Sequence, residues 1–127
     1  MKFLKIKLNE KTLGKIDISI AEYNEDKHGS KLDFYYDEIE TDLIDIVGLE
    51  DNIDIIVDDE GLLKPGIPVF ELFLGNEGPA HLAGTILLGR RSETIDGIDT
   101  IGFETQEQVR DVLDNIKVRV IGFTKSA

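Results

Sequence analysis

Apolar and polar residues alternate in several stretches of the chain, and such alternation predicts half-buried β-strands. Residues 3–8 alternate apolar side chains with lysines, and residues 14–21 alternate isoleucines with polar or charged residues. Together they predict an N-terminal hairpin within residues 1–21 that turns through residues 9–14.

The middle of the chain mixes two periods. Residues 31–36 follow the polar loop 23–30 and predict a third strand. Residues 37–47 carry apolar positions at helical spacing and predict a short amphipathic helix. That helix begins near Asp37 and ends near Gly48.

Alternation returns in residues 52–58, which predict a largely buried strand followed by a turn at residues 58–61. Further stretches between prolines and glycines predict strands over residues 67–74 and 81–89. A hairpin through Asp96 and Gly97 is predicted within residues 92–103.

Near the end of the chain, residues 105–116 show the clearest helical pattern. Thr105 and Gln108 form a capping-box sequence, and four apolar residues follow at helical spacing. Residues 117–123 alternate again and predict a final strand. The predicted fold is α+β: a single domain over residues 1–127, with a mostly antiparallel β-sheet and two short amphipathic helices.

Composition narrows the class of protein. The apolar content of 41% argues against disorder despite a net charge of −12. Cysteine is absent, which excludes disulfides and cysteine metal sites and fits a cytoplasmic location. The first residues alternate lysine with apolar side chains and lack the apolar core of a signal peptide, and no stretch is apolar enough for a membrane helix.

The acidic charge is concentrated in one third of the chain. Residues 17–60 contain sixteen acids against Lys27 and Lys31, which gives this segment a net charge of −14. Such a field repels nucleic acids and anionic membranes and favours a basic protein partner. The predicted partner-binding residues are the acids of residues 38–60: Glu38, Glu40, Asp42, Asp45, Glu50, Asp51, Asp54, Asp58, Asp59 and Glu60.

A second interaction is suggested by the lysines of the N-terminal hairpin. Lysines often protect edge strands from aggregation, and this is the ordinary reading of Lys2, Lys5, Lys7, Lys11 and Lys15. The alternative is contact with the acidic face of a second copy, which would make a homodimer.

The sequence contains only weak patterns for a metal site or a catalytic site. Residues 24–35 match a calcium-binding loop at several positions, but Tyr35 stands where the loop needs a glutamate. We therefore predict no metal site and no cofactor. His28 and His81 are the only side chains that ordinarily titrate near neutrality. A small hydrolase that uses either histidine with carboxylates is an alternative of another class.

Residues from about 42 to 116 show a recurring order of features: an acidic glycine turn, a glycine-containing strand and a closing helix. This order resembles an uncharacterised family of small acidic proteins carried by phages, plasmids and integrated elements of Gram-positive bacteria. Val69 stands where that family usually has asparagine. The resemblance rests on Glu60, Gly61, Leu63, Gly66, Pro68, Ala83, Gly84 and Gly89. It implies a mobile-element origin, and because the family has no established activity, it implies nothing about catalysis.

The sequence thus predicts a non-enzymatic cytoplasmic protein-binding module that acts through its acidic face. A sharper alternative is that this face imitates the phosphates of DNA and inhibits a host restriction or nucleic-acid-binding enzyme. The plain alternative is that the acids only keep the protein in solution.

Overall fold

A computed structural model describes residues 1–9, 11–12 and 14–125 of the chain. The turn predicted at residues 9–14 contains Glu10 and Leu13, which lie outside the described residues. The described elements are β1 (Lys2–Leu8), β2 (Ile16–Glu22), α1 (Glu25–His28), α2 (Lys31–Ile39), β3 (Ile44–Gly48), β4 (Ile53–Asp58), η1 (Gly61–Leu63), β5 (Pro68–Leu74), β6 (Glu77–Ala83), β7 (Ile86–Thr94), β8 (Gly97–Ile101), α3 (Gln106–Asn115) and β9 (Ile116–Phe123).

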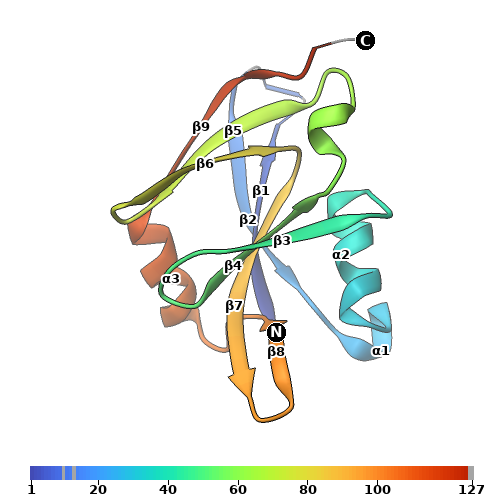
Figure 1. Ribbon diagram of the computed structural model, residues 1–127, viewed down its shortest axis with the longest axis vertical. Helices are drawn as coiled ribbons and strands as arrows, with labels where there is room; N and C mark the ends of the chain where they lie inside the picture. The colour runs from blue at the N-terminus through green and yellow to red at the C-terminus, as the bar shows by residue number, and fades with distance from the viewer. Residues whose placement is uncertain (10, 13, 126–127) are drawn as a thin grey trace.

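The strands form two antiparallel sheets (Figure 1). The larger sheet has the order β2-β1-β7-β4-β3. Its central strand β7 is long enough to pair with β1 and β4 in its first half and with β8 in its second half. The smaller sheet has the order β6-β5-β9. This arrangement leaves β3 as a terminal strand of the larger sheet.

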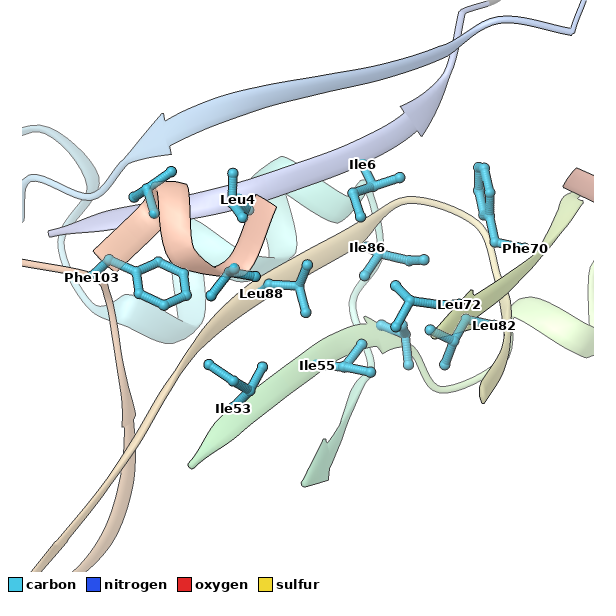
Figure 2. Close-up of a cluster of buried hydrophobic side chains, with 13 residues drawn as sticks. Leu4, Ile6, Ile53, Ile55, Phe70, Leu72, Leu82, Ile86, Leu88 and Phe103 are labelled. Atoms are coloured by element: carbon cyan, nitrogen blue, oxygen red, sulfur yellow. The ribbon is translucent and has the colours of Figure 1, made fainter. Parts of the chain in front are cut away.

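One hydrophobic core lies between the two sheets. Figure 2 shows Ile55 of β4 and Leu88 of β7 directed toward the same space as Leu72 of β5 and Leu82 of β6. Helix α3 adds two buried valines to this core. Burial of these apolar side chains is the main force that holds the two sheets together.

A second core covers the opposite face of the larger sheet. Phe34 and Tyr35 of α2 pack against Phe3, with ring centroids 5.4 and 5.5 Å apart, and against Ile56 and Leu87 of the sheet. Strand β4 is therefore buried on both faces. The molecule is a three-layer α+β domain, with α1 and α2 on one face of the larger sheet and the smaller sheet with α3 on the other (Figure 1).

Two predictions for the middle of the chain are wrong. Residues 31–36 are not a strand but the beginning of α2, and residues 37–47 are not one helix. Helix α2 ends at Ile39, because Glu40 adopts a left-handed conformation with φ of 60°. The chain then returns as strand β3, whose β-branched residues favour an extended backbone.

The loop and strand predictions need two smaller corrections. Part of the predicted loop 23–30 forms the one-turn helix α1. The strand predicted over residues 81–89 is interrupted at Gly84, which has φ of 90° and separates β6 from β7. A residue with a side chain rarely adopts that backbone conformation, so the glycine allows the chain to pass from one sheet to the other.

The other predicted elements are confirmed, namely the strands of the N-terminal hairpin, strands β4, β5 and β9, the β7–β8 hairpin and helix α3. The capping residues of α3 behave in part as expected, because the Gln108 side chain bonds the Glu104 N–H and not the Thr105 N–H of a full capping box. The Thr105 hydroxyl accepts the Gln108 N–H at 3.2 Å, and the Gln108 side chain accepts the Glu104 N–H at 2.8 Å. No helix in the described ranges is long and apolar enough to cross a membrane.

Candidate functional site

The ten predicted partner-binding acids do not form one continuous surface. Seven are exposed, Glu38 and Asp58 are partly buried, and Asp54 is buried. The exposed acids gather mainly at the two ends of the β3–β4 hairpin. The turn end carries Glu50 and Asp51, whereas the open end carries Glu40, Asp42, Asp59 and Glu60. Asp45 lies along β3 between them.

Asp54 is a structural residue and is not available to a partner. Its side chain accepts hydrogen bonds from the Arg91 guanidinium at 3.0–3.1 Å and from the Thr100 hydroxyl at 2.6 Å. The guanidinium also donates to the Leu49 carbonyl at 3.3 Å. These contacts offset the cost of burying a carboxylate. Asp54 therefore ties β4 to β7 and β8 inside the larger sheet.

Asp58 and Lys64 form an internal pair at the open end of the hairpin. The Lys64 ammonium lies 2.5 Å from the Asp58 carboxylate, which also accepts the Thr41 hydroxyl and the Glu60 N–H. Partial burial by itself would raise the pKa of Asp58. The hydrogen bonds outweigh burial and hold that pKa below its ordinary value.

Lys64 also neutralises part of the surrounding acidic surface. Its hydrogen bond to Asp58 raises the pKa of the ammonium, and the nearby charges of Glu60 and Asp42 raise it further. Glu38 of α2 pairs with Lys5 of β1 at 2.7 Å. Internal cations therefore compensate several of the predicted acids.

The turn end of the hairpin opens onto a cavity with a volume of about 750 Å³. This volume is in the range of small-ligand sites. Six parts of the chain meet there: the β3–β4 turn, the start of β4, the β5–β6 turn with its flanking residues, β7, the segment before α3, and α3 itself. The lining residues are Glu50, Asp51, Ile53, Leu74, Gly75, Asn76, Glu77, Arg90, Phe103, Gln108, Asp111, Val112 and Asn115.

Backbone geometry fixes the acids at the cavity mouth. Asp51 and Asn52 both have positive φ, 59° and 58°, as the central residues of a tight type I′ turn require. The Glu50 N–H donates to the Glu77 carboxylate at 2.7 Å, which joins this turn to β6. Gly75 N–H donates to the Asn115 carbonyl at 2.8 Å and joins the β5–β6 turn to α3.

The cavity has an apolar wall and an acidic rim. Ile53, Phe103 and Val112 are buried core residues that form part of the wall. Four carboxylates, those of Glu50, Asp51, Glu77 and Asp111, belong to its lining, and Arg90 is the only lining cation. Arg90 extends to the exposed carboxylate of Glu104, at 3.1 Å. The field at the rim therefore favours cations.

Sequence reasoning identified two of the four rim acids and missed Glu77, Asp111 and Arg90. Glu77 lies between the strands predicted over residues 67–74 and 81–89, and Asp111 lies outside the apolar positions of the predicted helix 105–116. Neither residue carries a local signal, because only the packing of β6 and α3 against the β3–β4 turn brings them together.

The two histidines lie apart from this cavity. His28 ends α1, where its ring packs on Phe34 at 5.0 Å and its Nδ1 accepts the Asn24 N–H at 3.0 Å. His81 is exposed on β6, with its Nε2 3.5 Å from the Glu71 carboxylate. Both environments have a clear role in packing or surface pairing. Among the described residues, no three acidic or histidine side chains are grouped as a metal site.

No protein-family model, curated protein or solved structure matches this chain. The resemblance of residues 42–116 to small acidic mobile-element proteins, and the origin that it implies, stay predictions.

Proposed function

We propose that this protein is a non-enzymatic cytoplasmic binding module that recognises a basic segment of another protein. The acidic cavity at the turn end of the β3–β4 hairpin is its main contact. One observation carries the proposal: four carboxylates from three separate parts of the chain belong to the lining of a cavity whose only cation already contacts Glu104.

The chemistry of the cavity matches a lysine or arginine side chain. Both have an apolar stem that packs on surfaces such as Phe103 and Val112 while the charged head stays among polar groups. Asn76, Gln108 and Asn115 add amide groups to the lining. An anion would meet like charge from four carboxylates, so the same cavity disfavours nucleic acid.

DNA mimicry receives less support from this arrangement. It needs acids spaced like phosphates along one face, but Asp54 is buried and Asp58 is paired with Lys64. The remaining exposed acids of residues 38–60 fall mainly into two groups at opposite ends of a hairpin. A basic protein segment requires only one such group.

The proposal is tested by selecting peptides from a random display library on the immobilised protein at low salt. We expect lysine- or arginine-rich peptides that elute as salt rises, because screening weakens exposed charge contacts. The double variant Glu50→Gln/Asp51→Asn should bind the selected peptides about tenfold more weakly, a difference of about 1.4 kcal/mol.

A matched control is available at the other end of the same hairpin. Asp59→Asn/Glu60→Gln removes the same two charges and leaves the cavity intact. It should bind the selected peptides nearly as well as the unmodified protein. Selection of peptides without basic residues, or equal weakening by the two double variants, would contradict a site at the cavity.

A further inference from the structure

Strand β3 ends the larger sheet and pairs with β4 alone among the described strands (Figure 1). A terminal strand presents one row of backbone N–H and C=O groups to the outside. β3 leads directly into the turn that carries Glu50 and Asp51, so this row begins beside the acidic cavity.

The hydrogen-bond register shows which backbone groups face outward. Residues 43 and 59 are joined by a backbone hydrogen bond, as are residues 49 and 53. Antiparallel pairs alternate between bonded and non-bonded, so the odd-numbered residues of β3 bond to β4. Ile44, Ile46 and Gly48 therefore direct their N–H and C=O groups to the open edge.

Asp45 occupies part of this edge in the free protein. Its Oδ1 accepts the Ile46 N–H at 2.9 Å. This contact fits the register, because an N–H already bonded to β4 would not be free to reach Asp45. It covers one of the outward donors and leaves the neighbouring positions open. Such partial protection limits pairing between copies without closing the edge to a better-matched partner.

The side chains around the edge define the partner's chemistry. Asp42, Asp45, Glu50 and Asp51 are exposed along β3 and at its two ends. Ile46 is 45% exposed and can contact an apolar side chain. An extended segment that alternates cationic and apolar residues matches both features, because successive side chains of a strand point to opposite faces.

We infer that the basic partner binds by adding an extended strand to the open edge of β3, with a cationic side chain near the cavity. This inference rests on the proposed function and gives it a geometry. Main-chain hydrogen bonds to β3 would supply affinity, and the flanking acids would select lysine or arginine.

The test uses a defined probe, a capped seven-residue peptide that alternates lysine and valine. Binding is measured by titration calorimetry to the complete chain. Ile46→Pro removes the outward N–H without touching a hydrogen bond to β4, and proline is tolerated at such edge positions. Ile46→Ala removes the exposed side chain but keeps the N–H. We expect Ile46→Pro to weaken binding at least about tenfold and Ile46→Ala to weaken it less.

Amide hydrogen exchange on the unmodified chain gives a second readout that does not depend on the variants. Binding of the peptide should slow exchange at Ile44 and Gly48, whose N–H groups face the open edge. A peptide held only by charge in the cavity would leave these amides unprotected.

The outcomes separate the inference from the proposed function. Weakening by Glu50→Gln/Asp51→Asn, with unchanged binding to Ile46→Pro and no protection at β3, would overturn the strand geometry and support the cavity. Absence of any peptide binding would overturn the inference, and the library selection would then judge the proposed function. A glutamate–valine peptide that binds equally well would contradict the selection of cations.

Discussion

The two ends of the β3–β4 hairpin both carry exposed acids, but these acids have different surroundings. At the open end, Lys64 pairs with Asp58 and lies near Glu60 and Asp42. At the turn end, Glu50 and Asp51 line a cavity whose cation, Arg90, reaches toward Glu104. In the described part of the chain, neither carboxylate of the turn end has an ion pair.

This difference shows that local acidic density does not identify a binding surface. Acids with internal cations contribute to the fold, and acids without them remain able to attract an external cation. Asp54, in the middle of β4, is the extreme internal case because it is 2% exposed and bonded to Arg91. Variants along the hairpin should therefore affect stability at one end and binding at the other.

The largest expected effect follows from Arg91→Leu. This change leaves the buried Asp54 carboxylate without its cation, and breaking a buried pair in this way costs about 3 kcal/mol of the free energy of unfolding. Urea unfolding measures the loss. Arg90→Leu is the control, because its ion-pair partner Glu104 is exposed and such pairs contribute about 0–1 kcal/mol. If the two changes lower the free energy of unfolding equally, the buried pair of Asp54 contributes no more to the fold than the exposed pair of Glu104.

Gly48→Ala should produce the next largest loss. A Cβ added at Gly48 would lie 2.1 Å from an Arg91 guanidinium nitrogen, so Arg91 must move away from Asp54. We expect the free energy of unfolding to fall by about 1–3 kcal/mol. Repeating the change in an Arg91→Leu background should remove most of the cost, and urea unfolding of the double variant checks this. An undiminished cost would mean that Arg91 is not the obstacle.

The sequence predicted the α+β class because apolar and polar residues alternate clearly in the strands near the two ends of the chain. The prediction of individual elements was wrong where helical and strand spacing of apolar residues overlap. In residues 37–47, helical spacing of apolar residues competed with the β-branched residues of the later strand, and tertiary packing favoured the strand. The start of α2 had a sequence signal at Ser30, a residue type that favours the N-cap position. Its hydroxyl accepts the Asp33 N–H at 3.1 Å and caps the helix.

The candidate site was less predictable than the fold. Glu50 and Asp51 belonged to the predicted acidic segment, but this segment also contained Asp54, which is buried and has a structural role. Whether an acid meets an internal cation depends on strands distant in sequence, and local patterns do not encode that pairing. The same limit explains why Asp111 on α3 was missed.

Asp58→Asn should have a smaller, pH-dependent effect. The hydrogen bonds from Lys64, Thr41 and Glu60 hold the pKa of Asp58 below its ordinary value, so they stabilise the fold above about pH 4. This stabilisation is lost as pH falls through the lower folded-state pKa. We expect the variant to lose about 1 kcal/mol of the free energy of unfolding at neutral pH and less in acid. Urea unfolding of the variant and the unmodified protein, at neutral pH and in acid below the pKa of Asp58, tests this. If the two proteins differ by the same free energy of unfolding under both conditions, the role assigned to Asp58 is wrong.

Glu50→Gln/Asp51→Asn should change stability least. No internal cation depends on either side chain in the described structure, so the free energy of unfolding should stay within about 0.5 kcal/mol. Thermal or urea unfolding provides the check. A large loss would mean that these acids serve the fold, as Asp54 does.

The most direct test of the account is a side-by-side titration of the lysine–valine peptide into three proteins: the unmodified chain, Glu50→Gln/Asp51→Asn and Asp59→Asn/Glu60→Gln. The two variants have the same net charge, so any difference between them reports position. The account predicts about tenfold weaker binding for the turn-end variant and little change for the open-end variant. Equal affinities for the two variants would contradict the claim that the turn end is the binding surface.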